Sequence, residues 1–259
     1  MNNVGVIEMY EQYSKLVLSR KEGYHFMTGK LYGIGVGPGD PELLTVKAIN
    51  AIKKLDVIIA PKTEKKEGSV ALNIAKEHIR PETEIIYQVF PMTVGFAADD
   101  TAWQNNKKEI LALLEQGKNV GFLTIGDPMF YSTYIYVFRL LQQEKVEIET
   151  IPGIPAFCAI GSATNTPIVE GDCILSIIPA NMPEERVKAA LKTCDNAVLM
   201  KVYKNSDEII DMLAAEGLAK QAVLASRCGL DDEVIIRDIS QEKGRKLNYL
   251  STILTRKDK

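Results

Sequence analysis

The chain has 259 residues, of which 46% are hydrophobic and 25% charged, and its formal net charge is −3. This size and balance suit one large or two ordinary globular domains, and they give no support to a broad nucleic-acid or membrane-surface role. No apolar run approaches the roughly 20 residues of a membrane helix. The four cysteines form no Cys-x-x-Cys pair and only two histidines occur, so we expect no metal site. We also expect the protein to be cytoplasmic and its thiols to be reduced.

Residues 1–26 differ from the rest of the chain. They lack the basic start, apolar core and small-residue cleavage site of a signal peptide. Lys21-Glu22-Gly23 can be encoded by a purine-rich ribosome-binding sequence shortly before Met27. We therefore hypothesise that Met27 is the start and that 1–26 is translated leader. The alternative is a genuine N-terminal helix, because apolar residues there fall near helical spacing. Peptides from before Met27 in the native protein would refute the leader hypothesis.

Strands and helices alternate after Met27. Pro41 suits a first helical turn, Ser69 can cap a helix, and Pro61 is expected to stop the second strand. Asp99 or Asp100 can cap a long helix that ends before Gly117. The order indicates an α/β fold with a mainly parallel sheet. We predict strands at 31–36, 57–60, 84–87, 120–124 and 148–151, and helices at 41–54, 69–78, 99–116 and 130–143.

The Pro-Gly-Ile-Pro segment at 152–155 interrupts this alternation. We place a domain boundary there, which gives an N-terminal domain at 27–150 and a C-terminal domain at 151–259. The second half has two clear helical patterns, at 183–191 and 206–215. Its last strands follow one another without helices, which favours a mixed sheet with antiparallel edges. The predicted strands are 173–178, 197–202, 222–225, 233–238 and 249–254.

A glycine-rich segment, GIGVGPGDP at 33–41, follows the first strand and precedes a helix. The dinucleotide spacing G-x-G-x-x-G fails in every register, and no Gly-Lys-Ser/Thr follows, so a phosphate loop is also excluded. What remains is a loop whose glycines let a ligand approach the backbone, or a tight structural turn.

Two further segments are candidates for a ligand site. Gly126-Asp127-Pro128 follows the strand at 120–124, where open α/β sheets bind ligands; alternatively, Asp127 only caps the next helix. Residues 152–156 can form a hinge and cleft wall, or a plain linker. No Ser or Cys has a plausible His partner, so a hydrolase triad is not expected.

These three segments, in this order, resemble the tetrapyrrole methylase superfamily. The matching stretches are GVGPGDPELLT at 35–45, GDPMFYST at 126–133 and PGIPA at 152–156, and the likeness covers essentially all of 27–259. Within the superfamily, the detail is similar to C20-methyltransferases that act on precorrin-2 or its cobalt form. Supporting residues are Ala60-Pro61-Lys62, the run at 67–71, residues 90–93, Trp103 and the run at 124–134.

The resemblance implies two α/β domains with a cleft between them, a homodimer, and S-adenosyl-L-methionine as methyl donor, with S-adenosyl-L-homocysteine as product. It also implies a tetrapyrrole substrate of the cobalamin pathway and neither nucleic-acid nor membrane partners. Relatives often carry Thr or Ser where this chain has Pro155, so a hydroxyl and an N–H are missing there. The implied donor contacts are Pro38, Ile125, Gly126, Asp127, Phe130, Pro155, Ala156, Met200, Lys201 and Cys228. The substrate candidates are Asp40, Lys62, Tyr131 and Arg227.

Methyl transfer from a sulfonium to an electron-rich meso carbon needs positioning and exclusion of water more than an activated side chain. No base for the departing meso proton can be named from the sequence. The main alternative is a superfamily methylase that acts at another corrinoid carbon. Others are an RNA or elongation-factor methylase, for which a basic stripe would be expected, and a non-catalytic corrinoid carrier, which would not bind the methyl donor.

Overall fold

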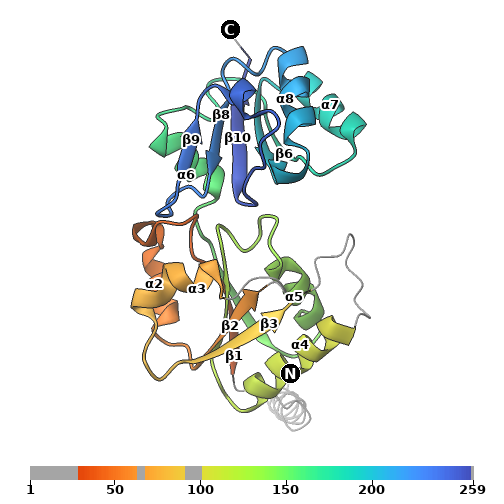
Figure 1. Ribbon diagram of the computed structural model, residues 1–259. Coiled ribbons are helices and arrows are strands. Elements are labelled where there is room, and N and C mark those ends of the chain that lie inside the picture. Colours follow the sequence, from red (N-terminus) through yellow and green to blue (C-terminus); the bar gives the residue numbers. More distant parts are fainter. Residues whose placement is uncertain (1–28, 63–67, 91–100, 258–259) are drawn as a thin grey trace, which may run out of the picture.

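The computed structural model describes residues 29–62, 68–90 and 101–257, which form two α/β domains joined end to end (Figure 1). The predicted two-domain α/β fold is confirmed. The leader hypothesis, the cap at Asp99 or Asp100, and the branch residues at 67 and 91–93 lie outside the described residues. None of the helices in the described ranges is long and apolar enough to span a membrane.

The first domain is built on a five-stranded sheet in the order β3-β2-β4-β1-β5, with every pair parallel. The carboxyl ends of all five strands therefore lie at one edge, where loops from distant parts of the sequence converge. The strands are β1 (Lys30–Gly35), β2 (Val57–Lys62), β3 (Glu84–Val89), β4 (Val120–Thr124) and β5 (Glu147–Ile151).

Helices cover both faces of this sheet, because the strand side chains that point to either face are apolar. Ile34 and Ile58 pack with α2 (Val46–Ile52) and α3 (Val70–Ala75), whereas Leu31 and Phe122 pack with α4 (Thr101–Glu115) and α5 (Tyr134–Leu141). The covering on both faces accounts for the nearly continuous apolar runs of the central strands. Short 3₁₀ turns, η1 (Pro41–Leu43) and η2 (Lys76–His78), complete the layer.

Three local predictions in this domain were wrong. The expected helix at 41–54 is divided, because Thr45 caps a new helix after η1. Pro61 continues β2 and is paired with Gln88 of β3. It lies beyond Ile59, the last β2 residue paired with β4, so its missing N–H does not interrupt the β2–β4 ladder. The helix expected from 130 begins at Tyr134, because Tyr131 has a left-handed φ of 48°.

The second domain has a mixed sheet in the order β6-β7-β10-β8-β9. The expected mixed sheet is confirmed, with an antiparallel edge pair at β8–β9. The other edge pair, β6–β7, is parallel, and β10 is antiparallel in the centre of the sheet. The buried run from 251 to 255 explains the central place of β10, because both of its faces are covered. The strands are β6 (Leu175–Pro179), β7 (Asn196–Met200), β8 (Val223–Ser226), β9 (Val234–Ile236) and β10 (Ser251–Arg256).

Helix α6 (Ala156–Ala163) was missed at the sequence level. Its sequence, AFCAIGSA, has no charged residue, so there is no polar face for a helical period to reveal. It packs on Val198, Ala225 and Leu254, while α7 (Glu184–Thr193) and α8 (Ser206–Ala215) cover the other face. The remaining turns are η3 (Val202–Lys204) and η4 (Ile239–Glu242).

Gly33 gives a stability prediction for the first domain. A Cβ at this position would overlap the buried ring of Tyr134, whose hydroxyl is 2.8 Å from the Thr150 hydroxyl. We expect Gly33→Ala to lower the free energy of unfolding by about 1–3 kcal/mol, the usual cost of overpacking. In a Tyr134→Leu background the same substitution should cost much less. Equal costs in both backgrounds, measured by urea unfolding, would contradict this packing account.

Candidate active site

Three loops meet at the carboxyl edge of the first sheet, and they follow neighbouring strands β4, β1 and β5. The amide of Gly126 donates to the carbonyl of Gly37, with 2.7 Å between nitrogen and oxygen. A Cβ on Gly35 would lie 2.6 Å from both the Gly126 oxygen and the Gly153 nitrogen. The three segments singled out in the sequence therefore form one glycine-lined cradle, and a side chain on Gly35 or Gly153 would disrupt it.

Asp127 ties this cradle together. Its Oδ1 accepts from the amide of Met129 at 2.8 Å, and its Oδ2 accepts from the amide of Gly153 at 3.0 Å. The first bond closes the local turn but does not cap a helix, because α5 begins at Tyr134 with Thr133 as its N-cap. The second fixes the loop after β4 to the hinge after β5. Each carboxylate oxygen retains a lone pair, so this half-buried side chain can still accept from a ligand.

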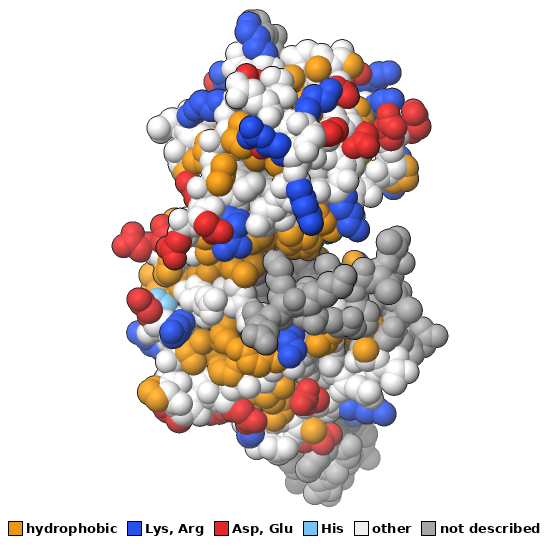
Figure 2. All heavy atoms as spheres, viewed as in Figure 1, with side chains coloured by type: hydrophobic (Ala, Val, Ile, Leu, Met, Phe, Trp, Pro, Cys, Tyr) orange, Lys and Arg blue, Asp and Glu red, His pale blue; other side chains and the backbone are white. Residues whose placement is uncertain are grey.

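The second domain directs its own strand ends at this cradle. β7 and β8 are both antiparallel to β10, so Met200 and Ser226 end their strands on the same side. Gly39 meets the carbonyl of Cys228 so closely that an added Cβ would overlap it. Figure 2 shows the molecule hollowed at the waist between the two domains, with hydrophobic side chains along it. The cradle therefore lies beside a cleft between the domains.

Tyr131 and Lys201 span this cleft from opposite sides. The Lys201 ammonium nitrogen lies 5.4 Å from the centre of the Tyr131 ring, and the Tyr131 hydroxyl is 3.5 Å from the Ile177 carbonyl oxygen. Both residues have left-handed backbones, with φ of 48° at Tyr131 and 62° at Lys201. Such conformations cost energy and concentrate at ligand sites. Burial lowers the pKa of Lys201, because the site disfavours the charged amine.

An aromatic wall continues from Tyr131. The Phe130 ring centre lies 4.8 Å from that of Tyr131 and 5.5 Å from that of Phe157 in α6. Phe157 was not proposed from the sequence, because α6 itself was missed. The hydroxyls of Thr124 and Ser132, 2.8 Å apart, were also not singled out, although both lie in the GDP-containing run. This pair holds the loop that carries Phe130 and Tyr131.

The other proposed donor contacts lie around the cradle. Pro38 is buried, and Ile125 packs on the β1–β4 core. Pro155 occupies the N-cap of α6 without a side-chain hydrogen bond, and Ala156 begins that helix. Burial, and then Glu233, raise the pKa of Cys228 to about 12, so its thiol stays protonated and is no nucleophile.

The substrate candidates are more dispersed. Asp40 accepts from the amide of Glu42 at 2.8 Å and so caps η1. The Arg227 Nε pairs with the carboxylate of Asp232. Lys62 ends β2, where its ammonium lies 5.7 Å from the Tyr87 ring centre. Lys201 is the cation among these candidates that reaches across the cleft, to Tyr131. It has no carboxylate partner among the described residues.

Comparisons with known proteins agree with this architecture. Residues 30–242 match the family of tetrapyrrole (corrin/porphyrin) methylases. The chain is 35% identical over 232 residues to the cobalt-precorrin-2 C(20)-methyltransferase of Salmonella typhimurium, covering 89% of this chain and 98% of that protein. It is 32% identical over 234 residues to the precorrin-2 C(20)-methyltransferase of a Sinorhizobium species, covering 87% and 94%.

Solved structures share the fold. A cobalt precorrin-4 methyltransferase superposes with a TM-score of 0.69 at 21% identity, over 89% of this chain and 95% of that one. A uroporphyrin-III C-methyltransferase from Thermus thermophilus, complexed with S-adenosylhomocysteine, gives 0.65 at 18% identity, over 87% and 97%. Fold and site define a two-domain α/β protein with a glycine-lined ligand cradle beside an interdomain cleft. The chain belongs to the tetrapyrrole methylase family.

Proposed function

We propose that this protein is an S-adenosylmethionine-dependent methyltransferase that methylates C20 of precorrin-2 or cobalt-factor II in cobalamin biosynthesis. The observation that carries the proposal is the pair of relatives bearing C20-methyltransferase names, at 32–35% identity over 87–89% of this chain. The alternative, methylation at another corrinoid carbon, has weaker support, because the precorrin-4 enzyme shares 21% identity. Methylation assays with both substrates test the proposal directly.

The cradle suits the methyl donor in shape and chemistry. Gly126 is buried with φ of 70°, yet the atoms nearest to an added Cβ are 3.9 Å away, so space remains beside the backbone. The same region offers backbone groups and the free lone pairs of Asp127. S-adenosylmethionine supplies a methyl group on sulfonium and leaves as S-adenosylhomocysteine. We assign its contacts to Pro38, Ile125, Gly126, Asp127, Phe130, Pro155, Ala156, Met200, Lys201 and Cys228.

The substrate lies, in this proposal, across the cleft against Tyr131 and Lys201. Precorrin-2 carries many carboxylates, and a half-buried ammonium that no carboxylate of the described residues pairs with is a suitable partner for one of them. Lys62, Arg227 and Asp40 line the approach from neighbouring loops. The aromatic wall excludes water and holds the meso carbon in line with the donor. No side chain is assigned as the base that removes the meso proton.

Asp127 gives a test of donor binding. We expect Asp127→Ala to raise the dissociation constant of S-adenosylhomocysteine by up to about 30-fold, because two bonds that position the cradle are lost, each worth about 1 kcal/mol. The chain should stay folded, with a modest fall in melting temperature. Asp195→Ala is a control, since Asp195 likewise accepts a backbone amide, that of Ile174, but in the second domain. Unchanged donor affinity by calorimetry would limit Asp127 to a structural role.

We further propose that the enzyme acts in the cytoplasm as a homodimer. The resemblance to the family supports the homodimer, and the four free cysteines fit a reducing compartment. Light scattering on the purified protein should give twice the mass of one chain, and a single-chain mass at micromolar concentration would contradict the dimer.

A further inference from the structure

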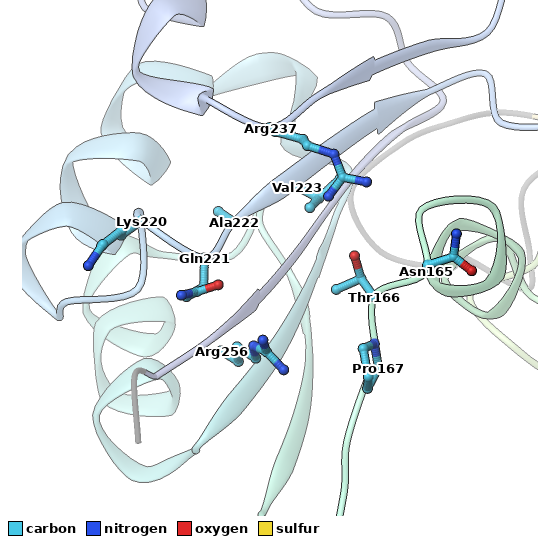
Figure 3. A pocket seen from close by; sticks show the side chains of 9 residues that line it. All are labelled: Asn165, Thr166, Pro167, Lys220, Gln221, Ala222, Val223, Arg237 and Arg256. Carbon is cyan, nitrogen blue, oxygen red and sulfur yellow. The ribbon is translucent and has the colours of Figure 1, made fainter.

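A cavity of about 260 Å³ lies at the end of the second domain opposite the cleft (Figure 3). Val223 begins β8 at this cavity, whereas Ser226 ends the same strand near Arg227 and Cys228. The turn at 165–167 follows the carboxyl end of α6, and the amino end of that helix is at the cradle. The cavity is therefore separated from the cleft by the length of a strand and of a helix, and the methyl-transfer site does not use it.

The charged side chains that line the cavity are all positive. Three of the lining side chains are cationic, and none is a carboxylate. Figure 3 shows the guanidinium groups of Arg237 and Arg256 on two sides of the hollow with Thr166 between them, while Lys220 is at the margin and points away. The lining consists of Asn165, Thr166, Pro167, Lys220, Gln221, Ala222, Val223, Arg237 and Arg256.

Both arginines keep unused hydrogen-bond donors. The Arg237 Nη2 donates to the carbonyl of Thr164 at 2.9 Å, which leaves its other N–H groups available. Arg256 is half-buried, and its guanidinium group makes no hydrogen bond or ion pair within the described part of the chain. The neighbouring Asp238 is committed elsewhere, because its carboxylate accepts from Ser240 and Gln241. No carboxylate in ranges 29–62, 68–90 and 101–257 therefore pairs with the guanidinium group of either arginine.

The backbone supports the same interpretation. Asn165 has a left-handed φ of 51°, and it is one of four non-glycine residues with positive φ in the described ranges. The other three, Tyr131, Lys201 and Arg227, all lie at the cleft. Strain of this kind persists where the surrounding structure holds a loop in a particular shape. Here it shapes the turn at 165–167, which forms one side of the cavity (Figure 3).

We propose that this cavity binds a small oxyanion carrying two or more negative charges, of the phosphate or polycarboxylate class. The planar guanidinium groups of Arg237 and Arg256 match the paired oxygens of either class. The cavity is a strand and a helix away from the cleft, so the ligand is distinct from the substrate. A bound anion would join the ends of β9 and β10 to the turn after α6, and it would thereby stabilise the second domain.

The test uses the full chain, with pyrophosphate and citrate as probes. Either anion should raise the melting temperature by about 2 °C or more when it is well above its dissociation constant, because it binds only the folded protein. Sodium chloride at equal ionic strength should not reproduce this shift. Pyrophosphate acting alone identifies the phosphate class, and citrate acting alone identifies the carboxylate class.

Arg256→Gln should abolish most of the shift and weaken anion binding at least tenfold by calorimetry. Arg245→Gln is the matched control, because Arg245 is an exposed arginine of the same domain and is paired with Glu242. Arg237 is less suitable, since it also holds the Thr164 carbonyl. The proposal is overturned if neither anion binds, if salt alone gives the same shift, or if the two variants respond alike. Affinity for S-adenosylhomocysteine should be unchanged in both variants, so failure here leaves the proposed methyltransferase function intact.

Discussion

Gly126→Ala should reduce the affinity for S-adenosylhomocysteine by about 100-fold while the chain still folds. The added methyl group would meet no protein atom closer than the Ile154 oxygen and the Pro155 Cα at 3.9 Å. It would instead occupy the open side of the cradle, where we place the donor. Overpacking of a fitted site costs about 1–3 kcal/mol, and 2.7 kcal/mol corresponds to about 100-fold in binding.

Gly171→Ala is the matched control for this substitution. Gly171 also has a positive φ, 57°, and an added Cβ there would have no atom within 4 Å. Placing alanine in a left-handed conformation therefore lowers the free energy of unfolding of both variants by about 1–2 kcal/mol. Only Gly126→Ala should lose donor affinity in calorimetry. If both variants bind the donor like the parent protein, the donor does not occupy the cradle.

Lys201→Met should stabilise the free protein and weaken substrate binding, two effects of opposite sign. Burial lowers the pKa of Lys201, so the charged amine destabilises the folded state at neutral pH. This cost is fully present below the lowered pKa and disappears as the pH rises through it toward the ordinary lysine value. The melting temperature of the variant should therefore exceed that of the parent at pH 7, with the difference shrinking in alkaline solution.

The same substitution removes the proposed partner of a substrate carboxylate. A hydrogen bond to a charged group is worth about 1.5–3 kcal/mol, so KM for the tetrapyrrole should rise roughly 10- to 150-fold. Lys204→Met is the control, because Lys204 is exposed and its ammonium lies over the Tyr203 ring of its own domain. A lower melting temperature with unchanged KM in Lys201→Met would show that Lys201 only supports the fold.

The sequence allowed the three cradle segments to be identified, because each combines glycine or proline with a preceding strand. It did not reveal that they are neighbours. That depends on β1 lying between β4 and β5, and strand order is set by long-range packing that no local pattern records. Once parallel strands are adjacent, their carboxyl ends must converge, and the hydrogen bond between Gly126 and Gly37 follows.

Other features were inaccessible for identifiable reasons. Helix α6 was missed because its uniformly apolar and small residues show no period, and Phe157 was missed with it. The sequence suggested that Asp127 either contacts a ligand or caps the next helix, whereas its two carboxylate oxygens accept from the local turn and from the distant hinge. The lowered pKa of Lys201 depends on burial between domains, which the residues around it in the sequence do not indicate.

The most direct test of the proposed function is the position of the transferred methyl group. The purified protein is incubated with S-adenosylmethionine labelled with ¹³C in its methyl group, and with precorrin-2 or cobalt-factor II, and the product is examined by NMR. We predict that the label appears at C20 with at least one of the two substrates, together with S-adenosylhomocysteine. Label at another carbon of the macrocycle, or no label with either substrate, would contradict the proposed function.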